Sequence, residues 1–491
     1  MRWNPKEANR LWRYNLHYFD YLGESTRSLE EKCLLLDDWV ANNPPGSEPA
    51  WEPYTASLRI VNWCRFLSPL PIDCVKPAWL ASLYQQARWL EANLELHILA
   101  NHYFENIKAL LFAGSFFNDK NAARWLKKFQ RELIEQLHEQ TLADGGHYER
   151  SPQYHCILLE DYLDLFVLVA KNPELFTLQT YNELSTAIRA ALGVLIALQT
   201  PDDDIPLFND SASGAAARPS EIILRAKQLG LDPTQTEPKP VEIIDLPDTG
   251  LYGSKTKQDY FLIDCGAIGP NYQPGHTHCD FLSYVLMADN QWLVVDSGVS
   301  EYEPGEMRRY VRSTAAHNTV IVNGQEQSEV WGEFRVGRRA TRIQATMQRS
   351  AQGIDFHGSY RGFPSINGGI THRRRAMIKI TDNRIVQLDI ADDLEGDGLF
   401  STQSLVHFHP ALHVTIDRNV ANIFLNAQLI AQVAAIDTAT LRLEQGWYCP
   451  EFGLKQPNSV LVIECAGTRS LKISYTIRLC NRLTNIAQAT T

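Results

Sequence analysis

At residues 275–286 the chain reads GHTHCDFLSYVL, a polar segment that continues directly into an apolar run. Side chains alternate between the two faces of an extended strand, so His276 and His278 are expected to point the same way from one strand. Asp296 ends the next apolar run, and His317 begins another. Three neighbouring strands could each supply one of these side chains, and His, Asp and His form a donor set that suits zinc. The segment therefore predicts a sheet that carries a site.

Each of these residues also has a simpler interpretation. A single histidine in a strand is most often a hydrogen-bonded structural residue, and an aspartate before Ser-Gly is most often a turn former. The clustering favours a site, because the same stretch also holds tyrosines and arginines, among them Tyr302, Tyr310, Arg308, Arg309 and Arg312. Such a group is typical of a face that binds an anion or a metal ion.

The chain has 491 residues, more than one hydrophobic core normally supports, so two domains are expected. In the first half, apolar residues recur every three or four positions, which is typical of amphipathic helices joined as hairpins. Past Gly230, prolines punctuate a linker, and from Gly250 short apolar runs alternate with Gly, Asn and Asp turns, which indicates antiparallel strands. We therefore expect an α+β protein with a helical domain at residues 1–240 and an antiparallel β-sandwich at residues 241–491.

Composition excludes several classes of function. The formal net charge is −11, which argues against a nucleic-acid binder that relies on a general positive field. The nine cysteines show no close pair with metal-ligand spacing and no disulfide framework, so reduced thiols are expected. No apolar run approaches the length that spans a bilayer, and the first residues lack the apolar core of an export signal. As written, the sequence predicts a cytoplasmic location, or a periplasmic or secreted one if an upstream segment is missing.

Two polar segments stand out in the helical half. Asn101 and His102 precede an apolar helical run, where Asn101 could simply be a helix N-cap. Residues 144–155 read DGGHYERSPQYH, a glycine turn followed by two Tyr, two His, a Glu and an Arg close to the start of a helix. Loops held between rigid elements commonly carry functional groups. Both segments are therefore candidates for a site.

Four segments together carry a resemblance to a known family: residues 101–102, 145–155, 275–280 and 312–319. In this order, and over nearly the whole chain, they resemble the heparinase II/III family of polysaccharide lyases and its alginate-lyase relatives. The early segment at residues 11–20 is also similar, with less sequence upstream of it than many relatives have. The resemblance implies an (α/α) toroid followed by an antiparallel β-sandwich, and cleavage of a glycosidic bond beside a uronic acid by β-elimination.

The resemblance also implies catalytic roles. β-Elimination removes the proton from the carbon that bears the carboxylate, and this carbon is a weak acid until the carboxylate charge is neutralised. Asn101 matches the residue that binds the substrate carboxylate, with His102 or a nearby arginine helping. Tyr154 and His276 match the acid–base residues. One takes the proton and the other gives a proton to the leaving oxygen, or Tyr154 does both.

Metal-binding and substrate-binding roles follow from the same resemblance. His278, Asp296 and His317 match positions at which relatives bind zinc, and the implied Zn²⁺ is structural because elimination needs no activated water. Tyr302 and Tyr310 lie where some alginate-lyase relatives place a second catalytic tyrosine, and the spacing does not choose between them. The residues expected to contact substrate are Glu149, Arg150, His155, Tyr302, Tyr310 and Arg312.

Two other classes of function stay open. A glycoside hydrolase on an (α/α) toroid needs two carboxylic acids flanking the bond, and the candidates, which form no clear pair, are Glu149, Glu160, Asp161 and Asp210. A noncatalytic glycan-binding protein, or a protein of an exopolysaccharide gene cluster, could also use a lyase scaffold, because a fold alone does not fix function.

The expected partner is an acidic polysaccharide or oligosaccharide, with a bacterial uronic-acid polymer as the first guess. Residues 209–212 and 331–334 either line sugar subsites or form only a turn and a strand edge. Cleavage within the polymer or at its end, and a homodimer, are left open by the sequence.

Overall fold

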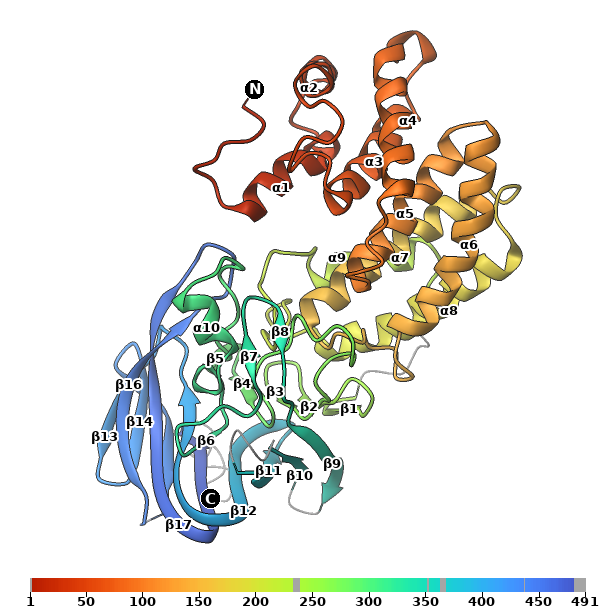
Figure 1. The fold of residues 1–491 in the computed structure, drawn as a ribbon. Helices are drawn as coiled ribbons and strands as arrows, with labels where there is room; N and C mark the ends of the chain where they lie inside the picture. Colours follow the sequence, from red (N-terminus) through yellow and green to blue (C-terminus); the bar gives the residue numbers. More distant parts are fainter. Residues whose placement is uncertain (1, 233–238, 351–352, 363–367, 437, 481–491) are drawn as a thin grey trace. The chain divides into compact units, whose positions relative to one another are not determined.

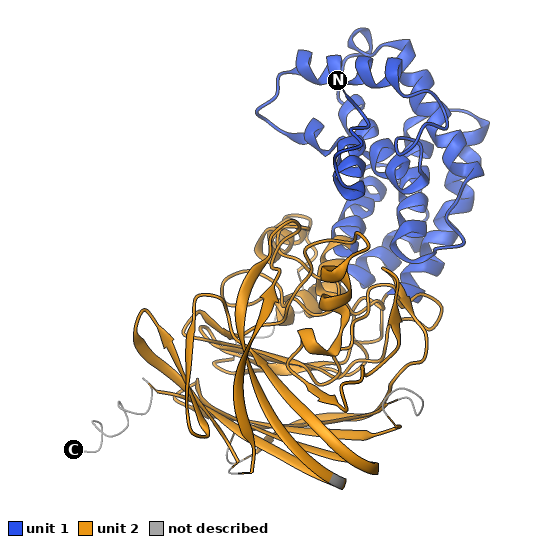
Figure 2. Ribbon diagram, turned by 60° about the vertical axis from the view of Figure 1, so that its left-hand side comes forward, with its two compact units in different colours: residues 1–140, 158–188 blue, residues 141–157, 189–491 orange. Residues whose placement is uncertain are grey.

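The computed structural model describes residues 2–232, 239–350, 353–362, 368–436 and 438–480. It divides into two compact units, which Figure 2 distinguishes by colour. Unit 1 contains residues 1–140 and 158–188, and unit 2 contains residues 141–157 and 189–491. The division therefore runs through two helices.

Unit 1 is helical (Figure 1), and some of its helices begin where the sequence provides the signals. For example, Ser28 and Glu31 form a capping box in which each side chain accepts from the other residue's backbone N–H. Within the described residues, no helix is sufficiently long and apolar to cross a membrane. The α-helices are α1 (Arg10–Tyr18), α2 (Leu29–Asn42), α3 (Pro53–Leu67), α4 (Pro77–Ala92), α5 (Ala100–Phe116), α6 (Lys120–Gln140), and parts of α7 (Pro152–Lys171) and α8 (Leu178–Leu198).

The start of α5 differs from the N-cap interpretation of Asn101. The N-cap is Leu99, and Asn101 lies in the first turn of the helix. Leu99 and Ala100 both have left-handed backbone angles, with φ of 63° and 51°. The Asn106 side chain accepts from the backbone N–H of Glu95 at 2.8 Å and so ties the preceding segment to the helix. The helix therefore begins at Ala100, before the position that an N-cap at Asn101 would give, and Asn101 is free to have another role.

Unit 2 contains antiparallel sheets. A five-stranded sheet has the order β1-β2-β3-β4-β5, and a ten-stranded sheet has the main path β13-β14-β15-β17-β12-β11-β10-β9, with β16 on β17 and β6 on β12. The strands of the first sheet are β1 (Glu242–Leu246), β2 (Leu251–Lys255), β3 (Tyr260–Asp264), β4 (Tyr284–Ala288) and β5 (Gln291–Val294). Those of the second are β6 (Val320–Val322), β9 (Thr341–Ser350), β10 (Gly353–Arg361), β11 (Thr371–Thr381), β12 (Arg384–His407), β13 (His413–Asp417), β14 (Val420–Leu425), β15 (Gln428–Ala435), β16 (Thr440–Tyr448) and β17 (Gln456–Leu479).

The two sheets share one hydrophobic core. Phe261 and Leu286 from the five-stranded sheet belong to the same buried cluster as Ile390 and Ile463 from the ten-stranded sheet. Alternating side chains of each strand enter this core, as expected for sheets packed face to face. The predicted order of a helical part followed by an antiparallel β part is thus confirmed. The predicted boundary at residue 240 stays a prediction, and it lies between α9 (Pro219–Gln228) and β1.

A buried arginine fixes the backbone near the candidate site. Arg374 on β11 forms an ion pair with Asp392 on β12, and both side chains are inaccessible to solvent. Its Nη1 also donates to the carbonyl oxygens of Leu282, at 2.7 Å, and Asn318, at 2.6 Å. The arginine therefore connects the ten-stranded sheet to the segments that follow His278 and His317.

Candidate functional site

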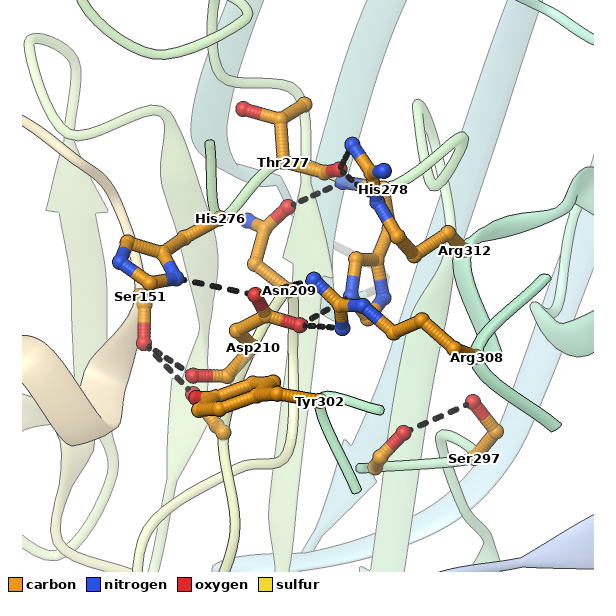
Figure 3. Close-up of polar contacts among 12 residues, drawn as sticks. Ser151, Asn209, Asp210, His276, Thr277, His278, Ser297, Tyr302, Arg308 and Arg312 are labelled. Carbon is orange, nitrogen blue, oxygen red and sulfur yellow. Dashed lines mark hydrogen bonds and ion pairs between the residues drawn. The ribbon is translucent and has the colours of Figure 1, made fainter. Parts of the chain in front are cut away.

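Asp210 is the centre of a buried polar cluster in unit 2 (Figure 3). Its Oδ2 lies 2.9 Å from Nδ1 of His276, and its Oδ1 lies 2.8 Å from Nε2 of His278. The Arg308 guanidinium, from α10 (Glu306–Arg312), binds both carboxylate oxygens, with Nη2 at 2.8 Å from Oδ2. One carboxylate thus holds two imidazoles and a guanidinium that lie 66, 68 and 98 residues later in the sequence.

His276 and His278 meet at Asp210 without the strand that we expected. The expectation is wrong, because β4 begins only at Tyr284 and the two histidines lie in a turn segment before it. Leu282 has a left-handed φ of 63°, and the backbone N–H of Ser283 donates to the carbonyl oxygen of Asp280 at 2.8 Å, so the chain bends here. The two imidazoles are brought together by a shared acceptor.

Electrostatics determine which atoms of this cluster carry a proton. Burial alone would raise the pKa of Asp210, but the Arg308 guanidinium outweighs it and holds that pKa well below its usual range. Asp210 is therefore ionised and can only accept, so Nδ1 of His276 and Nε2 of His278 donate to it. Burial lowers the pKa of His278 to about 4, which makes that ring neutral. Nε2 of His276 is then the basic nitrogen when this ring is neutral as well.

Tyr154 lies directly against His276. It sits in the first turn of α7, where its backbone N–H donates to Oγ of Ser151 at 3.3 Å. Its ring stacks on the imidazole of His276, with 3.9 Å between the ring centroids and 29° between the planes. Its hydroxyl oxygen lies 3.3 Å from the hydroxyl oxygen of Tyr302. Burial, and then the charge of Asp210, raise the pKa of Tyr302. An imidazole and a phenol in this arrangement can exchange protons with one bound molecule.

Two loops of unit 2 hold this arrangement through backbone contacts. Arg150 and Asn209 have left-handed φ values of 59° and 55°. The Asn209 side chain accepts from the backbone N–H of His278 at 3.0 Å and donates to the carbonyl oxygen of Arg150 at 3.2 Å. Oγ of Ser151 donates to the carbonyl oxygen of Asp210 at 2.7 Å. Non-glycine residues in this conformation cluster at functional sites, because the surroundings must stabilise them.

The residues expected to bind substrate fall into two groups. Tyr302 and Glu149 adjoin His276, and Oε1 of Glu149 lies 3.9 Å from Nε2 of His276. The other four bond to backbone groups instead: Arg150 to Tyr148 and Asp248, His155 to Ala191, Tyr310 to Trp447, and Arg312 to Thr277, Gly332 and Arg335. Their part in binding substrate stays a prediction.

Asn101 and His102 belong to unit 1. Nδ1 of His102 lies 2.9 Å from Oε1 of Glu95, and its ring centroid lies 4.4 Å from that of Tyr54. Glu95 in turn accepts from Nδ2 of Asn106 at 3.0 Å. These contacts give His102 a fixed orientation, and the expected role of Asn101 and His102 beside Tyr154 stays a prediction.

Among the three candidate zinc ligands, His317 lies next to both of the others. His317 Nδ1 lies 2.8 Å from Oδ2 of Asp296, and the rings of His278 and His317 have centroids 5.4 Å apart. Across the described ranges, no three or more His, Cys, Asp or Glu side chains are arranged to hold a metal ion. Nδ1 of His278, Nε2 of His317 and Oδ2 of Asp280 are nevertheless buried there without a hydrogen-bond partner. These three atoms are chemically suited to a metal ion.

Two of the four carboxylates that a hydrolase could use are paired with cations. Asp161 forms a buried ion pair with Lys108 in unit 1, and Asp210 is bound by Arg308. Our sequence reasoning named Asp210 only as a possible acid or subsite residue, and Arg308 only as part of a basic cluster. Their contact joins positions 98 residues apart, and the acidic and basic composition of the two segments was the only available signal.

Two family descriptions match the chain. Heparinase II/III N-terminus matches residues 3–227, and Heparinase II/III-like, C-terminal matches residues 238–478. The heparin-sulfate lyase of Pedobacter heparinus is 25% identical over 319 residues, which cover 59% of this chain and 47% of that protein. The heparin-sulfate lyase of Bacteroides thetaiotaomicron is 24% identical over 237 residues, 43% of this chain and 33% of that protein. The chain thus spans between a third and a half of these two relatives.

Solved structures show the same fold. A crystal structure of heparinase III superposes with a TM-score of 0.74 at 16% identity, covering 96% of this chain and 76% of the other. A xanthan lyase from Paenibacillus gives a TM-score of 0.51 at 10% identity and covers 97% of this chain and 54% of the other. At such low identities the likeness concerns the fold alone.

Proposed function

The chain belongs to the heparinase II/III family, and we propose that it is a polysaccharide lyase that cleaves a uronic-acid-containing acidic polysaccharide by β-elimination. The observation that carries the proposal is the stacking of Tyr154 on His276 while Asp210 holds Nδ1 of His276. This pairs a phenol with an oriented imidazole, which are the two groups that proton transfer in an elimination requires.

In the proposed reaction, Nε2 of His276 takes the proton from the carbon that bears the uronate carboxylate. The electrons of that C–H bond form a carbon–carbon double bond, and the bond from the neighbouring carbon to the glycosidic oxygen breaks. Tyr154 gives its hydroxyl proton to this oxygen. Asp210 stabilises the imidazolium that forms, as a carboxylate does beside a general-base histidine. Tyr154 acting as both base and acid is the second version of the same reaction.

Neutralising the substrate carboxylate is the proposed role of Asn101 and His102. Hydrogen bonds to the carboxylate stabilise the charge that develops as the proton leaves, which makes the carbon more acidic. The contact with Glu95 fixes the orientation of the His102 ring. We propose a heparan-type polymer as the first substrate to test, because the two relatives described above are named heparin-sulfate lyases.

The test is ultraviolet absorbance in the band of unsaturated uronates, with purified protein and a panel of heparan sulfate, hyaluronan, alginate and bacterial acidic exopolysaccharides. We expect a rise in absorbance with at least one uronate polymer, because elimination leaves a double bond conjugated to the carboxylate. New reducing ends without this rise would instead indicate hydrolysis. Neither signal, together with tight binding of a polymer, would favour the glycan-binding alternative.

We also propose that His278 and His317 hold a structural zinc ion, together with Asp296 or Asp280. Asp210 binds Nε2 of His278, and Asp296 binds Nδ1 of His317. The other nitrogen of each ring is buried without a hydrogen-bond partner. This carboxylate–histidine arrangement is common around metal ions. Bound zinc would supply structural stability to unit 2.

The zinc prediction can be checked without measuring activity. Purified protein should contain about one zinc per chain by elemental analysis, and a chelator should lower its melting temperature. His278→Ala should lower both the zinc content and the melting temperature, whereas His357→Ala, at a half-exposed histidine on β10, should change neither. Protein without bound metal after growth with zinc would contradict the prediction.

A further inference from the structure

The hairpin of β7 (Val330–Trp331) and β8 (Arg335–Val336) presents unusual side chains to solvent. Trp331 is 58% exposed and Phe334 is 38% exposed, although aromatic side chains of this size are usually buried. We propose that Trp331 and Arg335 form a subsite for an acidic sugar beside His276. This inference rests on the proposed function and extends it, because it names the residues that bind a neighbouring unit of the polymer.

Trp331 and Arg335 are direct cross-strand partners in the hairpin. Directly opposed side chains in an antiparallel pair lie on the same face of the ribbon, so the indole and the guanidinium are neighbours. Arg335 is exposed, and no described residue forms an ion pair or a hydrogen bond with its guanidinium. The pair therefore offers the apolar face of an indole together with a guanidinium that can bind a ligand.

These two groups match the two parts of an acidic sugar. The C–H groups on one face of a pyranose ring can stack on an indole, whose face is electron-rich. A carboxylate or sulfate on the same sugar can accept two parallel hydrogen bonds from a guanidinium. A neutral sugar would use only the first contact. The pair therefore favours a uronic or sulfated sugar.

The hairpin reaches the proposed catalytic pair through Phe334. The Phe334 ring contacts the imidazole of His276 edge-on, with 5.9 Å between centroids, and the ring of Tyr302, with 5.4 Å. Phe334 is the residue before Arg335. Since Trp331, Phe334 and Arg335 belong to one short hairpin, we place the sugar that Trp331 and Arg335 bind next to the reacting sugar, as an adjoining unit of one polymer.

Two buried arginines of α10 hold the hairpin in place. Arg308 donates to the carbonyl oxygen of Glu333 from Nε at 2.9 Å and from Nη2 at 2.6 Å. Arg312 donates to the carbonyl oxygens of Gly332 at 3.0 Å and Arg335 at 3.2 Å. Because Arg308 also binds Asp210, one side chain connects the hairpin to the residue that holds His276. A subsite fixed in advance loses less entropy when it binds a ligand.

The first test is steady-state cleavage of heparan sulfate by the full chain. Trp331→Ala and Arg335→Ala should each raise KM about tenfold and change kcat less than twofold, because they remove binding that is equal in the ground and transition states. Trp331→Phe and Arg335→Lys should recover part of the loss. Trp12→Ala is the matched control, since Trp12 is 52% exposed and lies on α1 of unit 1, and it should leave KM unchanged. An unchanged KM in both alanine variants would overturn the subsite.

A binding measurement separates this proposal from the proposed function. Calorimetric titration of the Tyr154→Phe protein with a heparan sulfate tetrasaccharide reports binding without turnover. Weaker binding by the double variants that add Trp331→Ala or Arg335→Ala to Tyr154→Phe would support the subsite. This holds even if the wild-type protein shows no cleavage, a result that would contradict only the proposed reaction. Equal affinity in all variants, or no binding by the Tyr154→Phe parent, would overturn the subsite even if wild-type cleavage were observed.

Discussion

Tyr154→Phe should lower kcat for the uronate polymer by about 10²- to 10⁴-fold, the range that a positioned general acid or base contributes. The change removes one hydroxyl group and keeps the ring that stacks on His276, so the fold and the affinity for substrate should stay close to wild type. Absorbance of the unsaturated product measures kcat, and a thermal melt measures the fold. Full activity in this variant would contradict the proposed role of Tyr154.

Two further variants make this result specific. Tyr475→Phe is the matched control, because the Tyr475 hydroxyl lies 3.1 Å from that of Tyr284 in the hydrophobic core of the sheets, and its loss should affect stability slightly and kcat little. His276→Ala should lower kcat within the same range as Tyr154→Phe. The double variant should lose little more than either single variant, because residues that act as one unit are not additive. Strict additivity would indicate that the two residues act in separate steps.

Arg308→Met should lower the free energy of unfolding by about 3–5 kcal/mol, the usual effect of removing one partner from a buried ion pair. Asp210 is fully buried and would keep an uncompensated negative charge, and the carbonyl oxygen of Glu333 would lose both of its donors. Chemical denaturation followed by circular dichroism measures the change. Asp210→Asn combined with Arg308→Met should recover part of the loss, since it removes the buried charge.

A surface ion pair provides the comparison for Arg308. Arg375 on β11 pairs with Asp355 on β10, and half of its side chain is exposed. Arg375→Met should therefore cost less than about 1 kcal/mol. Equal destabilisation by the two substitutions would mean that the Asp210 carboxylate is reached by solvent or changes its protonation state without Arg308.

The order of helices and strands could be predicted because it depends on local periodicity. The apolar residues of α6 recur every three or four positions and those of the strands alternate, so each element follows from neighbouring residues. Boundaries set by contacts between distant residues could not be predicted. The early start of α5 depends on Asn106 holding Glu95, and no pattern within the helix itself indicates this.

The candidate site was predictable to a similar extent. His276 and His278 were identified as neighbours for a local reason, their spacing of two, although the segment proved to be a turn. The carboxylate that joins them lies 66 and 68 residues earlier in the chain, and no spacing rule relates such positions. The candidate site histidines were thus easier to find in this sequence than the residues that orient them.

Arg308 and Arg312 hold the β7–β8 hairpin through main-chain oxygens, which every amino acid possesses. Trp331, Glu333 and Arg335 could therefore be exchanged for other residues while the anchoring contacts, and the Asp210–His276 pair behind them, are preserved. In the proposed subsite, exchanging these side chains would change the preferred polymer without changing the residues of the proposed reaction. For protein engineering, the hairpin is a segment in which libraries can be built with the chemistry held constant.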